Sequence, residues 1–293
     1  MSRVAFMTEV RSRFSVPAWV SRLLRDRLAL VGMLLIVPIV TLTFIGPLLI
    51  PYGPDTMDYM ATLQAPTFAH WMGTDDLGRD VLVRSMVGGQ LSLSVGLGAV
   101  AVAVVCGVPL GLISGYAGGW TDETIMRLID SLMALPPLVL ALTITAVLGP
   151  GLMNAMLAIA IVSVPTFTRL VRGQVMAIKQ HEYISAAVAV GVHPMRVMLR
   201  HILPNTIGPV IVQASLGIGF AIITESSVSF IGLGAQPPTA TWGSMVQVGF
   251  QYLQTAPWLA AAPAIAIFFA VLAFTMLAEG LRAVVDPASS NYA

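Results

Sequence analysis

The stretch EYISAAVAVGVHPMRVMLRHILPN, residues 182–205, predicts two short helices joined at a glycine and set between long apolar stretches. The first arm carries one apolar stripe at the helical spacing i, i+3, i+4 and i+7, made of Tyr183, Ala186, Ala187 and Val190. Because two of these four side chains are alanines, another helix or surface can approach the stripe closely.

The turn and the second arm carry the usual signals of helix ends. Gly191 suits a left-handed C-cap, and Pro194 suits the first turn of a second helix, which is expected to end at Pro204. Helices this short are marginal in water, so each arm needs a surface to pack against. That surface is either the ends of the chain's own spans or a groove on a separate protein. The second arm repeats the stripe spacing with Met195, Met198, Leu199 and Ile202.

The composition is that of an integral membrane protein. Of the 293 residues, 57% are hydrophobic and 10% are charged, and the mean hydropathy is +0.86. An ordinary globular protein has about 25% charged residues, so this chain has too little polar surface for a soluble protein of its length. The single cysteine, Cys106, excludes an internal disulfide and a metal site with several cysteine ligands. The net charge of +1 gives no electrostatic argument for nucleic acid, and neither a metal nor a nucleic acid is expected as a partner.

Six stretches are apolar over about the 20 residues that a helix needs to cross a bilayer. Residues 51–80 are rich in Pro, Gly and Asp and predict a loop outside the bilayer, and residues 232–257 predict a second loop. The expected fold class is therefore an all-α membrane protein with six transmembrane helices. The predicted spans are 28–50, 91–114, 125–148, 154–171, 207–231 and 258–281.

The basic residues are distributed asymmetrically across these spans. Six arginines precede the first span, five Lys and Arg residues lie within 169–200, and Arg127 and Arg282 fall on the same side. The other side has only Arg79 and Arg84. The positive-inside rule therefore places both termini and the hairpin in the cytoplasm and residues 51–80 outside. The first apolar run is too long for a cleavable signal peptide.

Three carboxylates lie within or near the spans, where a charge at the bilayer centre costs about 2.5–3.5 kcal/mol. Asp130 and Glu279 lie close to cytoplasmic ends and can reach the interface. Glu225 is deeper, and with the adjacent Ser226 and Ser227 it is either an interhelix polar contact or part of a transport pathway.

The hairpin resembles the EAA motif of ABC importer permeases, which reads Glu-Ala-Ala, three residues, Gly, nine residues, Ile, one residue, Leu-Pro. The spacing is intact from Ser185 through Gly191 to Leu203-Pro204. Ser185 replaces the glutamate and His201 replaces the isoleucine, which removes one possible contact to an ATPase.

Other stretches, in the same order along the chain, resemble the C-type permease subunits of dipeptide and oligopeptide importers. They are GTDDLGRDVLVRSMVGG (73–89), GGWTDETIMRLIDSLMALP (118–136), ESSVSFIGLGAQPPTATWGSM (225–245) and LRAVVDP (281–287).

The resemblance implies the MetI-like permease fold of a type I ABC importer in the bacterial cytoplasmic membrane. It implies ATP-driven uptake of peptides or similar small solutes through a heterodimer of homologous permeases surrounded by membrane lipid. It also implies two cytoplasmic ABC ATPase subunits, which bind the ATP and Mg, and an extracytoplasmic substrate-binding protein. No cofactor is implied for this chain.

The resemblance divides the chain into a cytoplasmic tail (1–27), a first transmembrane helix with an extracytoplasmic loop (28–84) and a five-helix core (85–293). Within the core it implies a coupling hairpin at 173–205, seated in a cleft of one ATPase. The residues implied to couple to the ATPase are Glu182, Tyr183, Ser185, Ala186, Ala187, Gly191, Pro194, Met195, Met198, Leu203 and Pro204.

The sequence carries no motif for catalysis. It has no GxxxxGK[ST] phosphate loop, and its only lysine, Lys179, lies outside any glycine loop, so we expect a subunit that is not an enzyme. A secondary transporter or channel that uses Glu225 is the main alternative, and a membrane anchor or assembly factor is a third. The glycine-rich and polar span segment 88–98 favours helices that move against one another over an inert anchor.

Overall fold

The computed structural model describes residue 23 and residues 26–285. The predicted tail, 1–27, lies almost wholly outside this part of the chain. Within it, five helices are long and apolar enough to cross a membrane, counting α11 together with the short turns that precede it. The helices are α3 (Arg27–Phe44), α5 (Val81–Ala117), α8 (Leu152–Ile178), α11 (Leu203–Phe230) and α13 (Trp258–Val285).

The third predicted span, 125–148, is not one straight helix. It consists of α6 (Gly119–Met133) and α7 (Pro137–Leu148), which are bent by 88° at the break between them. The break falls at Pro136-Pro137, where the ring of each proline disfavours helical backbone in the residue before it and removes a backbone donor. The described chain therefore has five continuous spans, and a sixth only when this bent pair is counted as one.

The long helices α5 and α8 pack closely because α5 presents glycines at every fourth position. A Cβ atom on Gly107, Gly111 or Gly115 would lie 2.6–2.8 Å from the nearest atom of α8. This is the small-residue spacing that lets membrane helices approach one another. The core between them and α11 includes Val100, Phe167 and Ala221, all buried.

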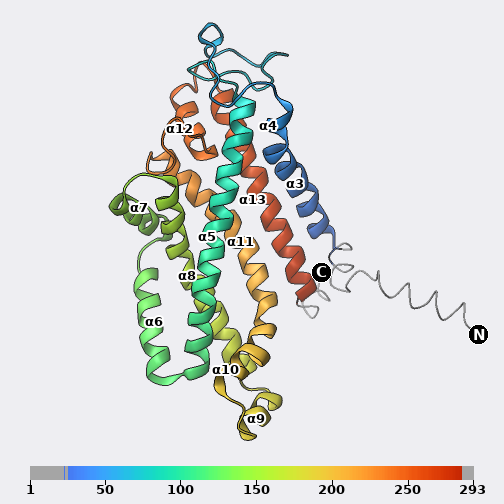
Figure 1. Cartoon of the computed structure of the whole chain (residues 1–293), viewed down its shortest axis with the longest axis vertical. Coiled ribbons are helices and arrows are strands. Elements are labelled where there is room, and N and C mark those ends of the chain that lie inside the picture. Colours follow the sequence, from blue (N-terminus) through green and yellow to red (C-terminus); the bar gives the residue numbers. More distant parts are fainter. Residues whose placement is uncertain (1–22, 24–25, 286–293) are drawn as a thin grey trace, which may run out of the picture.

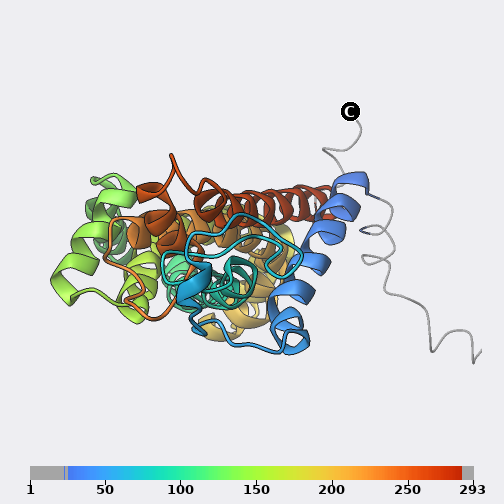
Figure 2. The ribbon, with the colours of Figure 1, turned by 90° about the horizontal axis from the view of Figure 1, so that it is seen from above.

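Helix α3 lies at one edge of the bundle and the α6–α7 pair at the opposite edge (Figure 2). Helix α3 packs closely on α13 where Gly280 of α13 faces Ala29 of α3. A Cβ atom added to Gly280 would lie only 2.3 Å from the Ala29 Cβ. The predicted first span, 28–50, is interrupted at Ile45 and continues as the short helix α4 (Gly46–Leu49).

The two predicted loops differ in content. Residues 51–80, called the outer lobe after their predicted side of the membrane, hold the 3-10 turn η1 (Tyr59–Ala61) and an isolated β-bridge between Thr74 and Asp80, and they lie at one end of the bundle (Figure 1). Residues 232–257, predicted as a loop, contain helix α12 (Trp242–Gln251). A capping box starts α12, because Thr241 and Ser244 each accept from the other's backbone N–H.

Candidate functional site

The predicted hairpin lies at the end of the bundle away from the outer lobe (Figure 1). It consists of α9 (Glu182–Ala189), α10 (Pro194–Val197) and the π-helical turn η2 (Met198–Ile202), which leads directly into α11. The expected two arms and the glycine between them are present.

The hairpin is anchored to its own spans by three buried side chains. Ile184, Val197 and Ile202 pack in one cluster with residues of α5 and α8, among them Leu112 and Val175. Packing on the chain's own spans is therefore part of the hairpin's structure. An anchored hairpin presents its remaining side chains as a fixed surface.

The opposite side of the hairpin is open, and we call it the hairpin face. Ala187 and Met198 are half-buried members, whereas Leu203, also half-buried, packs against the anchor cluster and is not part of this face. The exposed members are Glu182, Tyr183, Ser185, Ala186, Gly191, Pro194, Met195 and Pro204. The structure thus leaves most of the predicted coupling residues uncovered on one connected segment.

The turn between the arms is a Schellman motif built on Gly191. Its φ of +79° is in the left-handed region, as the sequence predicts. The Gly191 N–H donates to the Val188 carbonyl and the Val192 N–H donates to the Ala187 carbonyl, each at 3.0 Å. No atom lies within 4 Å of a Cβ built on Gly191, so only backbone strain opposes a larger residue there.

The second arm differs from the prediction in two respects. Pro204 does not end it, because the chain stays helical through η2 and Pro204 lies in the first turn of α11, where a missing N–H is tolerated. The predicted stripe is also divided, with Ile202 buried while Met195 and Leu199 are exposed. The wider π-helical turn rotates the residues that follow it away from a regular α-helical face.

An ion pair and a hydrogen bond join the end of α8 nearest the hairpin to α5 and α6. The Arg172 guanidinium donates to both carboxylate oxygens of Asp122 at 2.6 Å, and Lys179 Nζ donates to the Tyr116 carbonyl at 2.8 Å. In the sequence Arg172 and Lys179 indicated only membrane orientation. The structure adds that they join the base of the hairpin to a neighbouring helix.

Glu225 lies fully buried where α5, α11 and α12 meet. Its carboxylate accepts from Ser92 Oγ at 3.0 Å and from Ser229 Oγ at 2.7 Å, and the Ser92 Oγ also accepts from the Trp242 N–H. Glu225 therefore makes interhelix contacts, the first of its two predicted roles. Ser227 bonds to the Ile223 carbonyl of its own helix, and the buried Ser226 Oγ has no partner among the described residues.

The other two carboxylates reach exposed positions. Asp130 accepts from Arg169 at 2.5 Å, and Glu279 accepts from Arg282 at 3.2 Å. Each carboxylate and each arginine of these two pairs is exposed, which agrees with groups that reach the interface.

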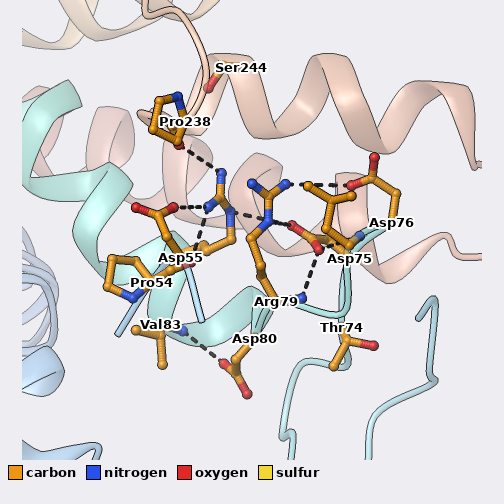
Figure 3. Close-up of polar contacts among 12 residues, drawn as sticks. Pro54, Asp55, Thr74, Asp75, Asp76, Arg79, Asp80, Val83, Pro238 and Ser244 are labelled. Atoms are coloured by element: carbon orange, nitrogen blue, oxygen red, sulfur yellow. Dashed lines mark hydrogen bonds and ion pairs between the residues drawn. The ribbon is translucent and has the colours of Figure 1, made fainter. Parts of the chain in front are cut away.

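A buried ion cluster at the outer end was not identified from the sequence, which used Arg79 and Arg84 only as orientation markers. Arg84 donates to Asp55 at 2.7 Å and to the Pro54 carbonyl at 3.1 Å, and Arg79 donates to Asp75 at 2.6 Å (Figure 3). The Arg84 Nε lies 3.5 Å from the same Asp75 carboxylate.

Arg84 also donates to the Pro238 carbonyl at 3.4 Å, which brings the segment before α12 into the same cluster. The side chains of Arg84, Arg79 and Asp75 are only 7–10% exposed. The cluster therefore joins the outer lobe, the start of α5 and the α11–α12 connection. In the described part of the chain, no group of three His, Cys, Asp or Glu residues is arranged to hold a metal ion.

Comparisons with known proteins match nearly the whole chain. Residues 107–291 match the family of binding-protein-dependent transport system inner membrane components, and residues 18–66 match the N-terminal TM domain of oligopeptide transport permease C. The dipeptide transport system permease protein DppC of Alkalihalophilus pseudofirmus is 44% identical over 266 residues, covering 91% of this chain and 88% of the relative.

Two further relatives and one solved structure give the same picture. The glutathione transport system permease protein GsiD of Pectobacterium atrosepticum is 41% identical, with 91% of this chain and 89% of the relative covered. The probable D,D-dipeptide transport system permease protein DdpC of Escherichia coli is 41% identical, with 97% and 95% covered. The inward-facing MetNI methionine ABC transporter matches with a TM-score of 0.54 and 18% identity, over 67% of this chain and 93% of that one, which establishes a shared fold.

Proposed function

The chain belongs to the binding-protein-dependent transport system inner membrane components, as a C-type permease of the dipeptide and oligopeptide importers, and we propose that its own cargo is a peptide or a glutathione-like solute. The relatives whose names state dipeptide and glutathione transport support this cargo class. The chain is the multi-pass permease subunit of an ABC importer in the inner membrane, with ATPase and substrate-binding protein partners.

The finer assembly is also part of the proposal. A homologous second permease completes the transport path, two cytoplasmic ABC ATPase subunits bind the ATP and Mg, and this chain catalyses no reaction. The absence of a GxxxxGK[ST] loop from the sequence supports a motor on separate subunits.

The proposed coupling element is the hairpin face, and the observation that carries this role is its combination of a buried anchor with an open surface. Ile184, Val197 and Ile202 fix the hairpin to α5 and α8, while exposed residues such as Tyr183 and Met195 are left for a partner. Movement of the bound ATPase would thereby be transmitted to the spans through the packed anchor.

Replacing Gly191 by valine tests this coupling. The left-handed backbone at Gly191 costs a β-branched residue about 1–2 kcal/mol, so the turn shifts toward another conformation. We expect Gly191→Val to reach the membrane at normal levels but to retain about tenfold less ATPase subunit on purification in mild detergent, with uptake reduced in parallel.

The matched control is Gly173→Val. The hairpin predicted from the sequence began at this residue, but Gly173 lies inside α8, before the hairpin proper begins with α9 at Glu182; it too has no neighbour within 4 Å of an added Cβ, and it has no positive φ. The control is expected to retain the ATPase. Normal ATPase retention and uptake in Gly191→Val would show that the hairpin face does not couple the two subunits.

The proposed orientation places both termini and the hairpin in the cytoplasm. We expect His193→Cys, in a Cys106→Ser background, to resist an impermeant thiol reagent in intact cells and to react after the cells are opened. Met60→Cys in the outer lobe is the control and should react in intact cells, because Met60 is almost fully exposed. The reverse labelling pattern would invert the proposed topology.

A further inference from the structure

Two neighbouring apolar hollows lie along the inner side of α3, and we call them together the α3 groove. They adjoin because Leu42, Leu82 and Met86 line both of them. The hollow beside the middle of α3 lies between α3, α5 and α13 and has a volume of about 350 Å³, at the small end of the roughly 300–1,000 Å³ of small-molecule pockets. Lining residues include Leu35, Ile39, Leu42, Met86, Ala266 and Phe269.

The depth of the groove corresponds to one leaflet of a bilayer. It begins at Leu35, near the middle of α3, and continues along the same edge to Leu49 at the end of α4. At 1.5 Å per residue this distance is roughly 20 Å, compared with about 15 Å for half of the hydrocarbon core. The groove is therefore long enough for an acyl chain from one leaflet, which is the outer leaflet in the proposed orientation.

The outer end of the groove has a different character from the rest. Tyr52, Trp71 and Asp80 line it there, and the Tyr52 hydroxyl donates to the Asp80 carboxylate at 3.2 Å. Tyrosine and tryptophan are enriched at the membrane–water interface, where an aromatic ring meets lipid headgroups. The site thus offers an apolar channel at membrane depth and a polar, aromatic end at its surface.

The surface around the groove favours lipid over a second protein helix as the occupant. α3 uses its small residues, Ala29 and Gly32, against α13, and its free side carries large aliphatic side chains such as Leu30, Leu34 and Val37. Close helix–helix contacts in membranes are built from small residues, whereas large aliphatic ones are typical of contact with acyl chains. Helix α3, which forms one wall of the groove, lies at the edge of the bundle (Figure 2).

We propose that the α3 groove binds an outer-leaflet phospholipid, with one acyl chain between α3, α5 and α13 and the headgroup beside Tyr52 and Trp71. The bound chain fills the space that separates the outer half of α3 from the core helices. The site is independent of the cargo and of the hairpin face.

The test fills the groove with a larger side chain. In the intact purified assembly, stripped stepwise of lipid and then given palmitoyl-oleoyl phosphatidylglycerol, native mass spectrometry counts the phospholipids that remain bound. We expect Ala266→Phe to retain one fewer per copy of this chain than the unmodified assembly. Ala264→Phe, on the same helix but exposed and outside the groove, should retain the full number.

A second pair avoids the buried core altogether. Leu42 lines both hollows and its side chain is more than half exposed, so Leu42→Trp fills the groove without disturbing the packing beneath it. It should also lose one phospholipid, whereas Val37→Trp, on the free side of α3, should not. Full lipid counts in both groove variants would overturn the proposal.

Photocrosslinking identifies the occupant directly. With Leu42 replaced by benzoylphenylalanine, illumination of the assembly in phosphatidylglycerol-containing nanodiscs should yield an adduct of phospholipid mass on this chain. A crosslink to another protein subunit instead would assign the groove to that subunit and overturn the lipid site.

Discussion

Vesicles that contain only this chain are expected to take up no dipeptide, whether ATP or a proton gradient is supplied. The sequence has no phosphate loop with which to bind ATP, and the hairpin face is left open by the rest of the chain. Vesicles that contain the chain with a second permease, the ATPase subunits and the binding protein should accumulate radiolabelled dipeptide when ATP is present on the ATPase side. A proton ionophore should leave that uptake nearly unchanged.

Uptake by the isolated chain under an ion gradient would refute the importer assembly and make Glu225 the first candidate for the coupling group. Glu225→Gln distinguishes the two cases. In a secondary transporter the substitution should abolish gradient-driven uptake, because the group that carries the proton is lost. In the importer, Glu225→Gln alters the hydrogen bonds with Ser92 and Ser229, so it should lower the stability of the packing between α5, α11 and α12. Uptake should still be driven by ATP.

The spans were predictable because hydropathy over about 20 residues reflects a single requirement, that apolar side chains face lipid. The break in the third span does not follow from hydropathy, because 125–148 is apolar on average and an average over the span does not reveal the effect of Pro136-Pro137. Helix α12 was missed for the opposite reason. Its turn-rich surroundings suggested a loop, although Thr241 and Ser244 at spacing i, i+3 are a recognisable capping pair.

The hairpin shows the limit of local signals. Gly191 was predicted correctly because a left-handed C-cap depends on its own residue and immediate neighbours. Pro204 was assigned wrongly, because a proline in a first turn and a proline after a last turn look alike in sequence, and only the packing of Ile202 and Val197 decides that the helix continues. The exposure of the hairpin face likewise depends on tertiary packing, because it is set by which side of the hairpin packs against α5 and α8.

The outer ion cluster could not be predicted, because its partners are distant along the chain. Arg84 bonds to Asp55, 29 residues earlier, and to the Pro238 carbonyl, 154 residues later. A positive charge in a span-flanking segment gives information about orientation, but its partners depend on the packing of the outer lobe against α5 and the segment before α12.

Arg84→Met is expected to destabilise the assembly by about 1–3 kcal/mol, the usual cost of leaving buried hydrogen-bonding groups without their partner. The substitution removes the donor that joins Asp55 and the Pro54 and Pro238 carbonyls, while Asp75 keeps Arg79 and the Asp55 side chain, 53% exposed, is open to water. For a chain of this length the cost corresponds to a fall of roughly 6 °C in the melting temperature, which a thermal unfolding scan of the purified assembly measures.

Arg127→Met is the matched control, because Arg127 also pairs with a carboxylate, Glu123 at 2.5 Å, but its side chain is 79% exposed. An exposed pair contributes only about 0–1 kcal/mol, so the control should melt within about 3 °C of the unmodified assembly. Arg84→Lys should fall between the two, because an ammonium keeps the charge without the planar fork that reaches several acceptors at once. Equal melting temperatures for Arg84→Met and Arg127→Met would mean that water replaces the guanidinium without cost, and that the Arg84 contacts do not stabilise the attachment of the outer lobe to α5.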